Sequence, residues 1–228
     1  MGKRHLKRLN MPKTWNIKRK SIKYIKRPNP GAHSFKNGMA LSIFLKNIGL
    51  AKTEKEVKNI INNQEVLING VKRTESKFIV GFMDIISIPS IKSYFRVIFD
   101  KKGKISTIKI DEKESKTKIC KINGKKMHKK GLQLNLSDGR NVLADKKECK
   151  VGDSVLIEIP KQTIKEIINF DVGSIVILIG GKNTGKIVEV QEINDKVMKC
   201  KDKDVMFETL KKYAFAIGKE KALVKVEE

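Results

Sequence analysis

Acidic residues are missing from the first quarter of the chain. Residues 1–53 contain no Asp or Glu, but they hold 14 of the 50 Lys and Arg residues. The whole chain of 228 residues has a formal charge of +25. Because mutual repulsion among that many cations destabilises a compact state, the excess indicates a polyanionic partner. RNA is the first candidate, and an anionic membrane surface is the second.

Cysteines and long apolar runs are also scarce. Cys120, Cys149 and Cys200 form no C-x-x-C pair and have no histidine at ligand spacing, which argues against a zinc site. Such sparse cysteines suit reduced thiols in the cytoplasm. No run of about 18 apolar residues is present to cross a membrane, and the N-terminus resembles neither a signal peptide nor a Ser- and Arg-rich transit peptide. We therefore expect a cytoplasmic protein without a membrane anchor, metal or cofactor.

Helical periodicity is clearest just after residue 40. Apolar side chains recur at spacings of three and four residues, which is typical of one face of a helix; they are Leu41, Phe44, Leu45 and Ile48. Gly49 follows where such a helix can end. Thr53 then precedes Glu56 by three residues, the spacing of a capping box, so a second short helix is expected from there.

Strand and turn signals follow the two helices. Residues 65–68, Glu-Val-Leu-Ile, form a strand-like run, and they lead into Asn69 and Gly70, a strong hairpin signal. A second apolar run occupies residues 84–88 and is stopped by Pro89. The helices and the hairpin therefore form one small unit.

Beyond residue 90 the chain consists of short apolar or alternating runs separated by turn signals. Such signals occur at residues 100–103, at Asn123 and Gly124, and at Asp138 and Gly139. Short, regularly spaced strands predict a small antiparallel β domain over 90–170 and a second β unit over 171–228. Neither region contains a catalytic constellation.

Residues 180–186 fit the P-loop pattern G-x-x-x-x-G-K. A P-loop needs Ser or Thr after the Lys to bind magnesium, but Ile187 stands there. The residues that follow are β-branched and alternating, which predicts a strand and not the helix that a phosphate site requires. The loop instead resembles a KOW motif, although Lys186 stands where that family more often has Arg and Val188 where it often has Gly. We therefore expect no nucleotide hydrolysis.

The unit at 39–89 resembles the S-four-type RNA-binding domain, which presents a basic helical face to folded RNA. Residues 81–88 resemble the signature of one family, the archaeal and eukaryotic small-subunit ribosomal protein S-four-e. Gln64 and Asn69 depart from the Arg and Asp usual in that hairpin, which puts only those two contacts in doubt. Further matches follow in family order, at residues 2–8, 12–15, 27–33, 138–140, 151–153, 180–183 and 215–219.

The resemblance implies an α+β, multidomain protein. Its parts would be a basic, extended N-terminal arm (1–38), an S-four-type domain of two helices and β structure (39–89), a central antiparallel β domain (90–170) and a small KOW-type β-barrel with a C-terminal segment (171–228). The implied role is a non-enzymatic, structural constituent of the small ribosomal subunit. The implied partners are small-subunit rRNA and neighbouring ribosomal proteins, with no small-molecule substrate and no homo-oligomer. A free regulatory RNA- or DNA-binding protein and an RNA-modifying enzyme stay open as alternatives.

The candidate RNA contacts are mostly basic residues, which would hold rRNA through phosphates and shape. In the arm they are Lys3, Arg4, His5, Lys7, Arg8, Lys13, Trp15, Lys18, Arg19, Lys20, Arg27, His33 and Lys36. In the helical unit they are Lys46, Lys52, Lys55, Lys58, Lys72 and Arg73, and in the glycine loop Lys182, Asn183 and Lys186.

Each group of candidates also has a structural alternative. Trp15 can pack in a core instead of stacking on a base, His33 can be structural, and the helix lysines can form a merely solvated face. The arm is too polar to fold alone and is expected to order on RNA. Removing residues 1–27 is therefore expected to flatten the salt dependence of RNA binding and leave the folded body intact.

Overall fold

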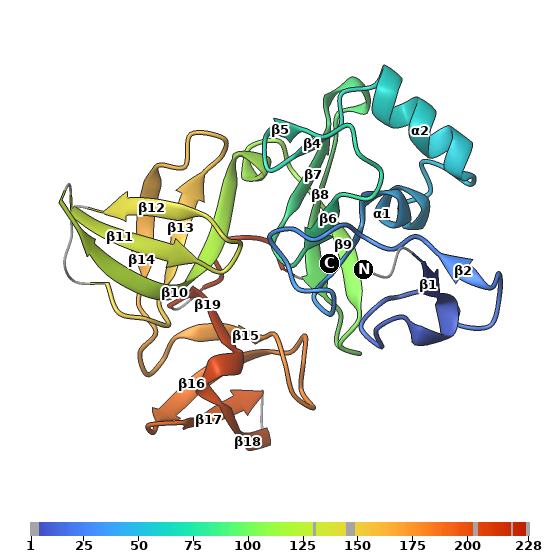
Figure 1. The fold of residues 1–228 in the computed structure, drawn as a ribbon. Coiled ribbons are helices and arrows are strands. Elements are labelled where there is room, and N and C mark those ends of the chain that lie inside the picture. Colours follow the sequence, from blue (N-terminus) through green and yellow to red (C-terminus); the bar gives the residue numbers. More distant parts are fainter. Residues whose placement is uncertain (1–4, 130, 145–148, 203–204, 220, 227–228) are drawn as a thin grey trace. The chain divides into compact units, whose positions relative to one another are not determined.

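The structure is a computed structural model that describes residues 5–129, 131–144, 149–202, 205–219 and 221–226 (Figure 1). It is mostly β, with two α-helices in the described part of the chain. The chain divides into two compact units. The first holds residues 1–98 with 104–115, and the second holds 99–103 with 116–228. None of the helices in the described ranges is long and apolar enough to span a bilayer.

The first unit holds both α-helices, α1 (Leu41–Asn47) and α2 (Glu54–Asn63). Short 3-10 helices occupy Arg8–Asn10, Pro89–Ile91 and Glu114–Lys116. The strands are β1 (Leu6–Lys7), β2 (Tyr24–Ile25), β3 (Gly38–Ala40), β4 (Leu67–Ile68), β5 (Val71–Lys72), β6 (Ile79–Gly81), β7 (Ile85–Ile88), β8 (Ser93–Phe99) and β9 (Ile105–Ile110). β1 pairs with β2 and β3 with β6, and the rest form one sheet in the order β5-β4-β7-β8-β9. This sheet therefore continues past residue 89.

Both predicted helices are confirmed, and local chemistry explains their ends. The buried face of α1 carries Leu41, Phe44 and Leu45, and Gly49 follows the helix with φ +88°. The capping box of α2 is formed: Thr53 Oγ1 accepts a hydrogen bond from the Glu56 N–H at 3.2 Å, and the Glu56 carboxylate accepts one from the Thr53 N–H. Two of the orphan N–H groups of the helix start are thereby satisfied.

The hairpin predicted at Asn69 and Gly70 is also confirmed, with strands of two residues each. Both turn residues have positive φ, 50° and 74°, as a two-residue turn matched to the strand twist requires. The pairing of Leu67 with Lys72 fixes its register.

A buried carboxylate joins the hairpin to the rest of the first unit. Asp84 is 2% exposed. Its oxygens accept hydrogen bonds from Asn69 Nδ2 at 2.7 Å and from the Gly81 N–H at 2.9 Å, and His33 Nε2 lies 2.8 Å away. Residue 81 must be glycine here, because a Cβ would lie 2.3 Å from the His33 ring. Asn69 also accepts a hydrogen bond from the Ile85 N–H, so its side chain serves the fold.

The N-terminal arm is looped in the structure, and the expectation of an extended arm is wrong for its described residues. β1 and β2 pair across a long loop, which brings Leu6 opposite Ile25. A few apolar side chains among the many charged ones explain this shape. Leu6, Met11 and Trp15 are all buried. They provide the arm with a small core shared with the first unit.

Trp15 packs in that core. It is 1% exposed, its backbone forms a parallel bridge with Ile105, and its ring lies 5.5 Å from that of Phe35. No face of the ring is open to a base, so the structural alternative holds for Trp15. The effect of deleting residues 1–27 stays a prediction, and because that deletion removes a buried tryptophan we now expect it to destabilise the first unit as well.

The second unit consists of two five-stranded antiparallel sheets. One has the order β12-β11-β10-β13-β14 and the other β18-β17-β16-β15-β19. The strands are β10 (Thr117–His128), β11 (Gly131–Leu136), β12 (Asn141–Ala144), β13 (Ser154–Glu158), β14 (Ile164–Ile168), β15 (Ile175–Leu178), β16 (Ile187–Ile193), β17 (Val197–Asp202), β18 (Val205–Leu210) and β19 (Ala214–Gly218). A 3-10 helix, Lys211–Tyr213, precedes β19.

The turn predicted at Asn123 and Gly124 is wrong, because β10 runs straight through it. The strand changes partner there: it pairs with β13 through Lys121 and with β11 from Ile122 onward, with a register shift between Ile122 and Gly124. An Asn-Gly pair is thus used for a bulge, which lets one long strand serve two neighbours.

A buried ion pair lies in the first of these sheets. Lys118 Nζ is 2.8 Å from Asp138 Oδ2, and both side chains are almost fully buried, with Arg140 Nε 3.4 Å from the same oxygen. Burial alone raises the pKa of Asp138, but Lys118 and Arg140 outweigh it and hold that pKa below its ordinary value. The pair therefore stabilises the sheet only while Asp138 is ionised.

Replacing Asp84 with Asn should destabilise the first unit by about 3 kcal/mol, because an amide nitrogen would face donors that now share a carboxylate. The only tryptophan, Trp15, is buried in this unit, so its fluorescence in urea reports the transition. Glu65→Gln, at an exposed acid of the same unit, is the matched control. Equal midpoints for D84N and E65Q would contradict the role given to Asp84.

Asp138→Asn should destabilise the protein by about 3–5 kcal/mol at neutral pH, because it leaves Lys118 buried without its charge partner. In the folded protein the pKa of Asp138 is lower than the ordinary value of an aspartate. Its contribution is therefore full above that value and is lost as pH falls through the folded pKa. Circular dichroism of urea unfolding at several acidic pH values should show a shallower acid-induced loss for D138N. A loss as steep as in the parent would be inconsistent with this pair.

Candidate nucleic-acid interface

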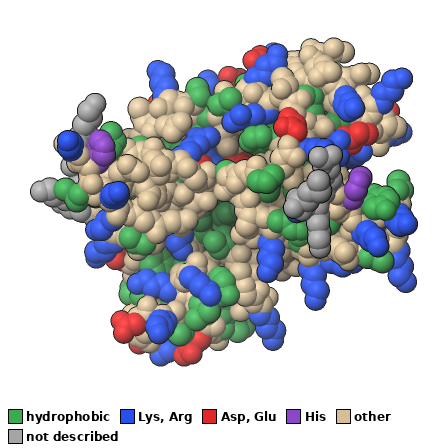
Figure 2. Space-filling view, in the orientation of Figure 1, with side chains coloured by type: hydrophobic (Ala, Val, Ile, Leu, Met, Phe, Trp, Pro, Cys, Tyr) green, Lys and Arg blue, Asp and Glu red, His purple; other side chains and the backbone are tan. Residues whose placement is uncertain are grey.

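Basic side chains outnumber acidic ones over the face drawn in Figure 2. Lys3 and Arg4 lie outside the described residues. The remaining candidate contacts separate into those that face solvent and those that the protein itself engages. The exposed candidates are His5, Lys7, Lys13, Lys18, Arg19, Lys20, Lys36, Lys52, Lys55, Lys58, Lys72 and Lys182; of these, Arg19 is also engaged by the protein.

The arginines are engaged by the protein. The chain has seven, and each of the six that the structure describes contacts another group. Arg8 donates to the carbonyls of Lys18 and Ile22, and Arg19 donates to those of Leu9 and Met11. The others contact aromatic rings or carboxylates: Arg27 lies over Phe35, Arg73 over Phe78, Arg96 beside Glu114 and Arg140 beside Asp138.

Some of the other candidate RNA contacts are also engaged by groups of the protein itself. His33 is half-buried and its ring lies against Asp84, and Trp15 is buried in the core. Lys46 lies 3.0 Å from Glu54, and Lys186 lies 3.0 Å from Asp202. Burial removes Trp15 from the surface that RNA could reach, whereas His33, Lys46 and Lys186 would have to exchange a carboxylate for a phosphate.

The face of α2 presents uncompensated charge. Glu54 stands four residues before Lys58, the spacing of a favourable helix pair, but it contacts Lys26 and Lys46 instead. Burial raises the pKa of Glu54, yet these two lysines outweigh it and lower that pKa. Neither Lys55 nor Lys58 has an ion-pair partner among the described residues. Both cations are therefore free to meet an external anion.

The glycine loop lies between β15 and β16. β16 begins at Ile187, so a strand and no helix follows Lys186, which confirms that this is not a P-loop. The loop packs on the turn at 100–103: a Cβ on Gly185, whose φ is +88°, would lie 2.0 Å from the Asp100 carbonyl oxygen. Lys182 is exposed and Asn183 half-buried. The loop thus reaches solvent at Lys182, away from its packed end.

Structure adds basic residues that sequence reasoning missed. Lys101 and Lys102 are exposed on the turn that covers Gly185, and no sequence signal brings that turn to the glycine loop. A groove of about 550 Å³ is bordered by Lys121, Lys196, Lys211 and Lys212. Lys121 Nζ donates to the Ala214 carbonyl at 2.6 Å, and burial, with Lys211 nearby, lowers its pKa to about 8.

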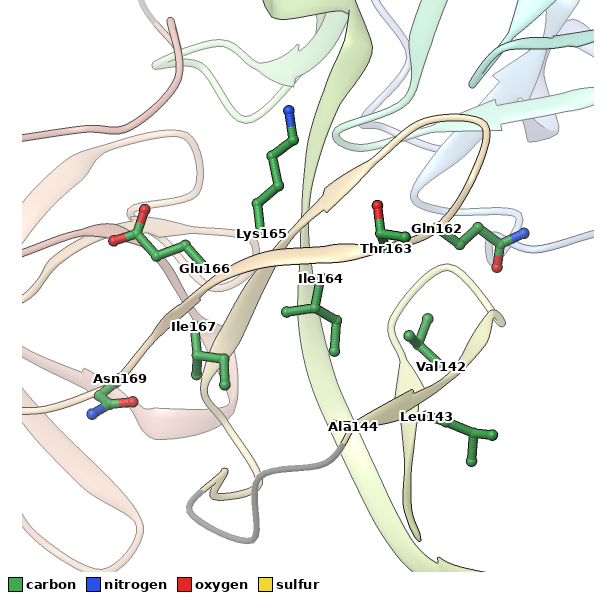
Figure 3. Close-up of a pocket in the computed structure, with 10 residues that line it drawn as sticks. All are labelled: Val142, Leu143, Ala144, Gln162, Thr163, Ile164, Lys165, Glu166, Ile167 and Asn169. Carbon is green, nitrogen blue, oxygen red and sulfur yellow. The ribbon is translucent and has the colours of Figure 1, made fainter. Parts of the chain in front are cut away.

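A cavity of about 770 Å³ lies between the edge strands β12 and β14 (Figure 3). Ile164, Ile167 and Val142 point into it, whereas Lys165 and Glu166 point away. Thr163, which also lines the cavity, donates its hydroxyl to the Glu158 carboxylate at 3.1 Å. The described residues contain no cluster of side chains suited to hold a metal.

The three cysteines are buried and form no disulfide with one another. Burial raises the pKa of Cys120 to about 12 and that of Cys200 to about 11. Thiols with such pKa values carry almost no thiolate at neutral pH, so these two are poor nucleophiles. The main chemical feature of the described surface is therefore its many exposed lysines, which can attract an anion.

Comparison with known proteins gives three matches to family models. They are the RS4NT (NUC023) domain at residues 1–36, the S4 domain at 40–86 and the ribosomal family S4e (S-four-e) at 91–164. The "small ribosomal subunit protein eS4" of Methanosphaera stadtmanae is 38% identical, over 98% of this chain and 96% of that protein. Its namesake in Methanothermobacter thermautotrophicus is 39% identical over the same shares.

A solved structure is similar as well. It is the crystal structure of the 30S ribosomal protein S4e from Thermoplasma acidophilum, with a TM-score of 0.70 and 26% identity. The similarity covers 80% of this chain and 95% of that one.

Proposed function

The chain belongs to the ribosomal family S4e, and we propose on that premise that it is a structural constituent of the small ribosomal subunit. Its role there is to bind and stabilise small-subunit rRNA. The observation that carries the proposal is similarity along almost the whole chain to proteins with that name. Those relatives are named as ribosomal proteins, and the role requires no catalysis.

The mechanism is electrostatic and passive. Exposed lysines of the arm and of α2 neutralise phosphates and release condensed counterions. Arg8 and Arg19 hold the arm in shape by donating to its own carbonyls, so less ordering remains to be done when RNA binds. Contacts of this kind recognise the sugar-phosphate backbone and the shape of rRNA segments, and they need few hydrogen bonds to the bases.

The finer architecture is part of the proposal. The sheet β18-β17-β16-β15-β19 serves as the KOW-type barrel, with Lys182 at the tip of its glycine loop. The residue divisions at 38, 89 and 170 stay predictions, and so do the individual RNA contacts. Small-subunit rRNA and neighbouring ribosomal proteins are the partners, in the cytoplasm and without a homo-oligomer.

The two alternatives have little support. An RNA-modifying enzyme needs a nucleophile, an acid–base pair or a cofactor site, and the apolar centre of the cavity between β12 and β14 offers none. A free regulatory RNA-binding protein uses the same cations, and only its location in the cell distinguishes it.

Co-sedimentation tests the proposed role directly. In a sucrose gradient of cell extract, the protein should travel with small subunits through moderate salt and leave them at high salt, because phosphate contacts weaken as salt rises. A cytoplasmic protein that forms no ribosomal contacts serves as the control. Recovery only in the free fractions would reject the structural role.

Neutralising Lys55 and Lys58 together should reduce the slope of log K against log salt by about 0.7–0.9 per lysine that contacts a phosphate. The measurement is binding of K55Q/K58Q to small-subunit rRNA across a salt series. Lys199→Gln is the matched control, since Lys199 is already paired with Glu192 at 2.7 Å. If the double variant and the control have the same slope, these helix lysines do not contact RNA.

A further inference from the structure

The exposed aromatic rings of this protein are confined to one segment. The chain has thirteen Phe, Tyr and Trp residues, all within the described ranges, and only Tyr24 and Phe35 are exposed. Both lie in the first 53 residues, which contain no acid. An exposed aromatic ring can stack on the face of a nucleobase, and nearby cations can bind the phosphates of the same nucleic acid.

Tyr24 is the more open of the two. It is 49% exposed, against 37% for Phe35. The ring of Phe35 packs at 5.5 Å from that of Trp15 and lies below the guanidinium of Arg27. The neighbour of Phe35, Trp15, is buried in the core, so Phe35 packs against the core. The neighbours of Tyr24, which are His5 and Lys23, are themselves exposed, so Tyr24 is the ring more open to a partner.

Strand pairing sets the direction of the Tyr24 side chain. β1 and β2 place Tyr24 opposite Lys7 and Leu6 opposite Ile25. Leu6 is buried and Ile25 half-buried, whereas Lys7 and Tyr24 are exposed. Because side chains alternate along a strand, Lys7 and Tyr24 share the solvent face of the β1–β2 ribbon.

The surroundings of the ring are cationic and apolar. The Lys23 ammonium lies 5.6 Å from the ring centroid of Tyr24, and the His5 ring lies 5.8 Å away at a tilt of 53°. Ile22, two residues before Tyr24, is 74% exposed. A base needs an apolar face to stack on and a phosphate needs a cation within reach, and this ribbon offers both.

The platform is held in place before any ligand arrives. Arg8 donates through its guanidinium to the carbonyls of Lys18 and Ile22, and its backbone N–H donates to that of Lys23 at 2.9 Å. Three hydrogen bonds from one residue thus fix the loop that leads into β2. A ring on a fixed loop loses little conformational entropy when it binds.

We propose that Tyr24 is a stacking platform for an unpaired nucleobase of RNA, with Lys7 and Lys23 beside it to meet the adjoining phosphates. The inference rests on the proposed RNA-binding function and deepens it. It assigns the arm a preference for single-stranded or extruded nucleotides over a continuous duplex, in which the faces of the bases are covered. A protein partner fits the site less well, because a surface so rich in cations favours a polyanion.

The test uses the full chain and two RNAs: a mixed-sequence single strand of about 12 nucleotides and the same strand paired with its complement. Tyr24→Ala should weaken binding of the single strand by about 5- to 100-fold and leave binding of the duplex unchanged. Tyr24→Phe, which keeps the ring, should bind as the parent does. The salt slope of Y24A should equal that of the parent, because no charge is lost.

Lys7→Ala is the matched control on the same face, and it should weaken both RNAs and lower the salt slope. Urea unfolding followed by Trp15 fluorescence shows whether each variant keeps its fold. Equal affinity of Y24A and the parent for the single strand would overturn the proposal. So would an equal loss on both RNAs, or a loss in Y24F as large as in Y24A. Failure of the parent to bind either RNA or small subunits would instead reject the proposed function.

Discussion

The first unit depends on one buried carboxylate. Asp84 accepts hydrogen bonds from the hairpin turn and from the end of β6, and its carboxylate lies 2.8 Å from His33, which precedes the helices. One side chain thus joins three segments that are separate in sequence. A charge taken out of water is tolerated only when its partners satisfy it. The hairpin, the helices and therefore the lysine face of α2 take their positions from this arrangement.

The cations of the protein divide into two populations with different tasks. The described arginines contact carbonyls, rings and carboxylates of the protein itself, and most lysines of the arm and of α2 face solvent. The planar fork of Arg can serve two acceptors at once, whereas Lys is a mobile point charge. The fold thus uses its few arginines as structural donors and leaves the lysines to attract a polyanion.

Local sequence signals predicted much of the fold. The features that depend on contacts between distant segments could not be predicted in the same way. The capping box at Thr53 and the turn at Asn69 need only their neighbours, and both are confirmed. Asn123 and Gly124 carry the same turn signal but lie in a strand that changes partner, which depends on β11 and β13. For the site, spacing identified the basic residues but not which of them the protein engages: Arg8 and Lys7 look alike in sequence, and only the structure shows that one is committed to the loop.

Because the arginines contact the protein itself, replacing Arg by Lys and replacing Lys by Arg should have different effects on the fold. Arg8 reaches two carbonyls with one side chain, and an ammonium at that place would leave one of them without a donor. At an exposed position such as Lys13, a guanidinium would keep the charge and disturb nothing nearby. Among related sequences, lysines at exposed positions should therefore be replaced by arginine without harm to the fold. The arginines that bind carbonyls should instead be retained.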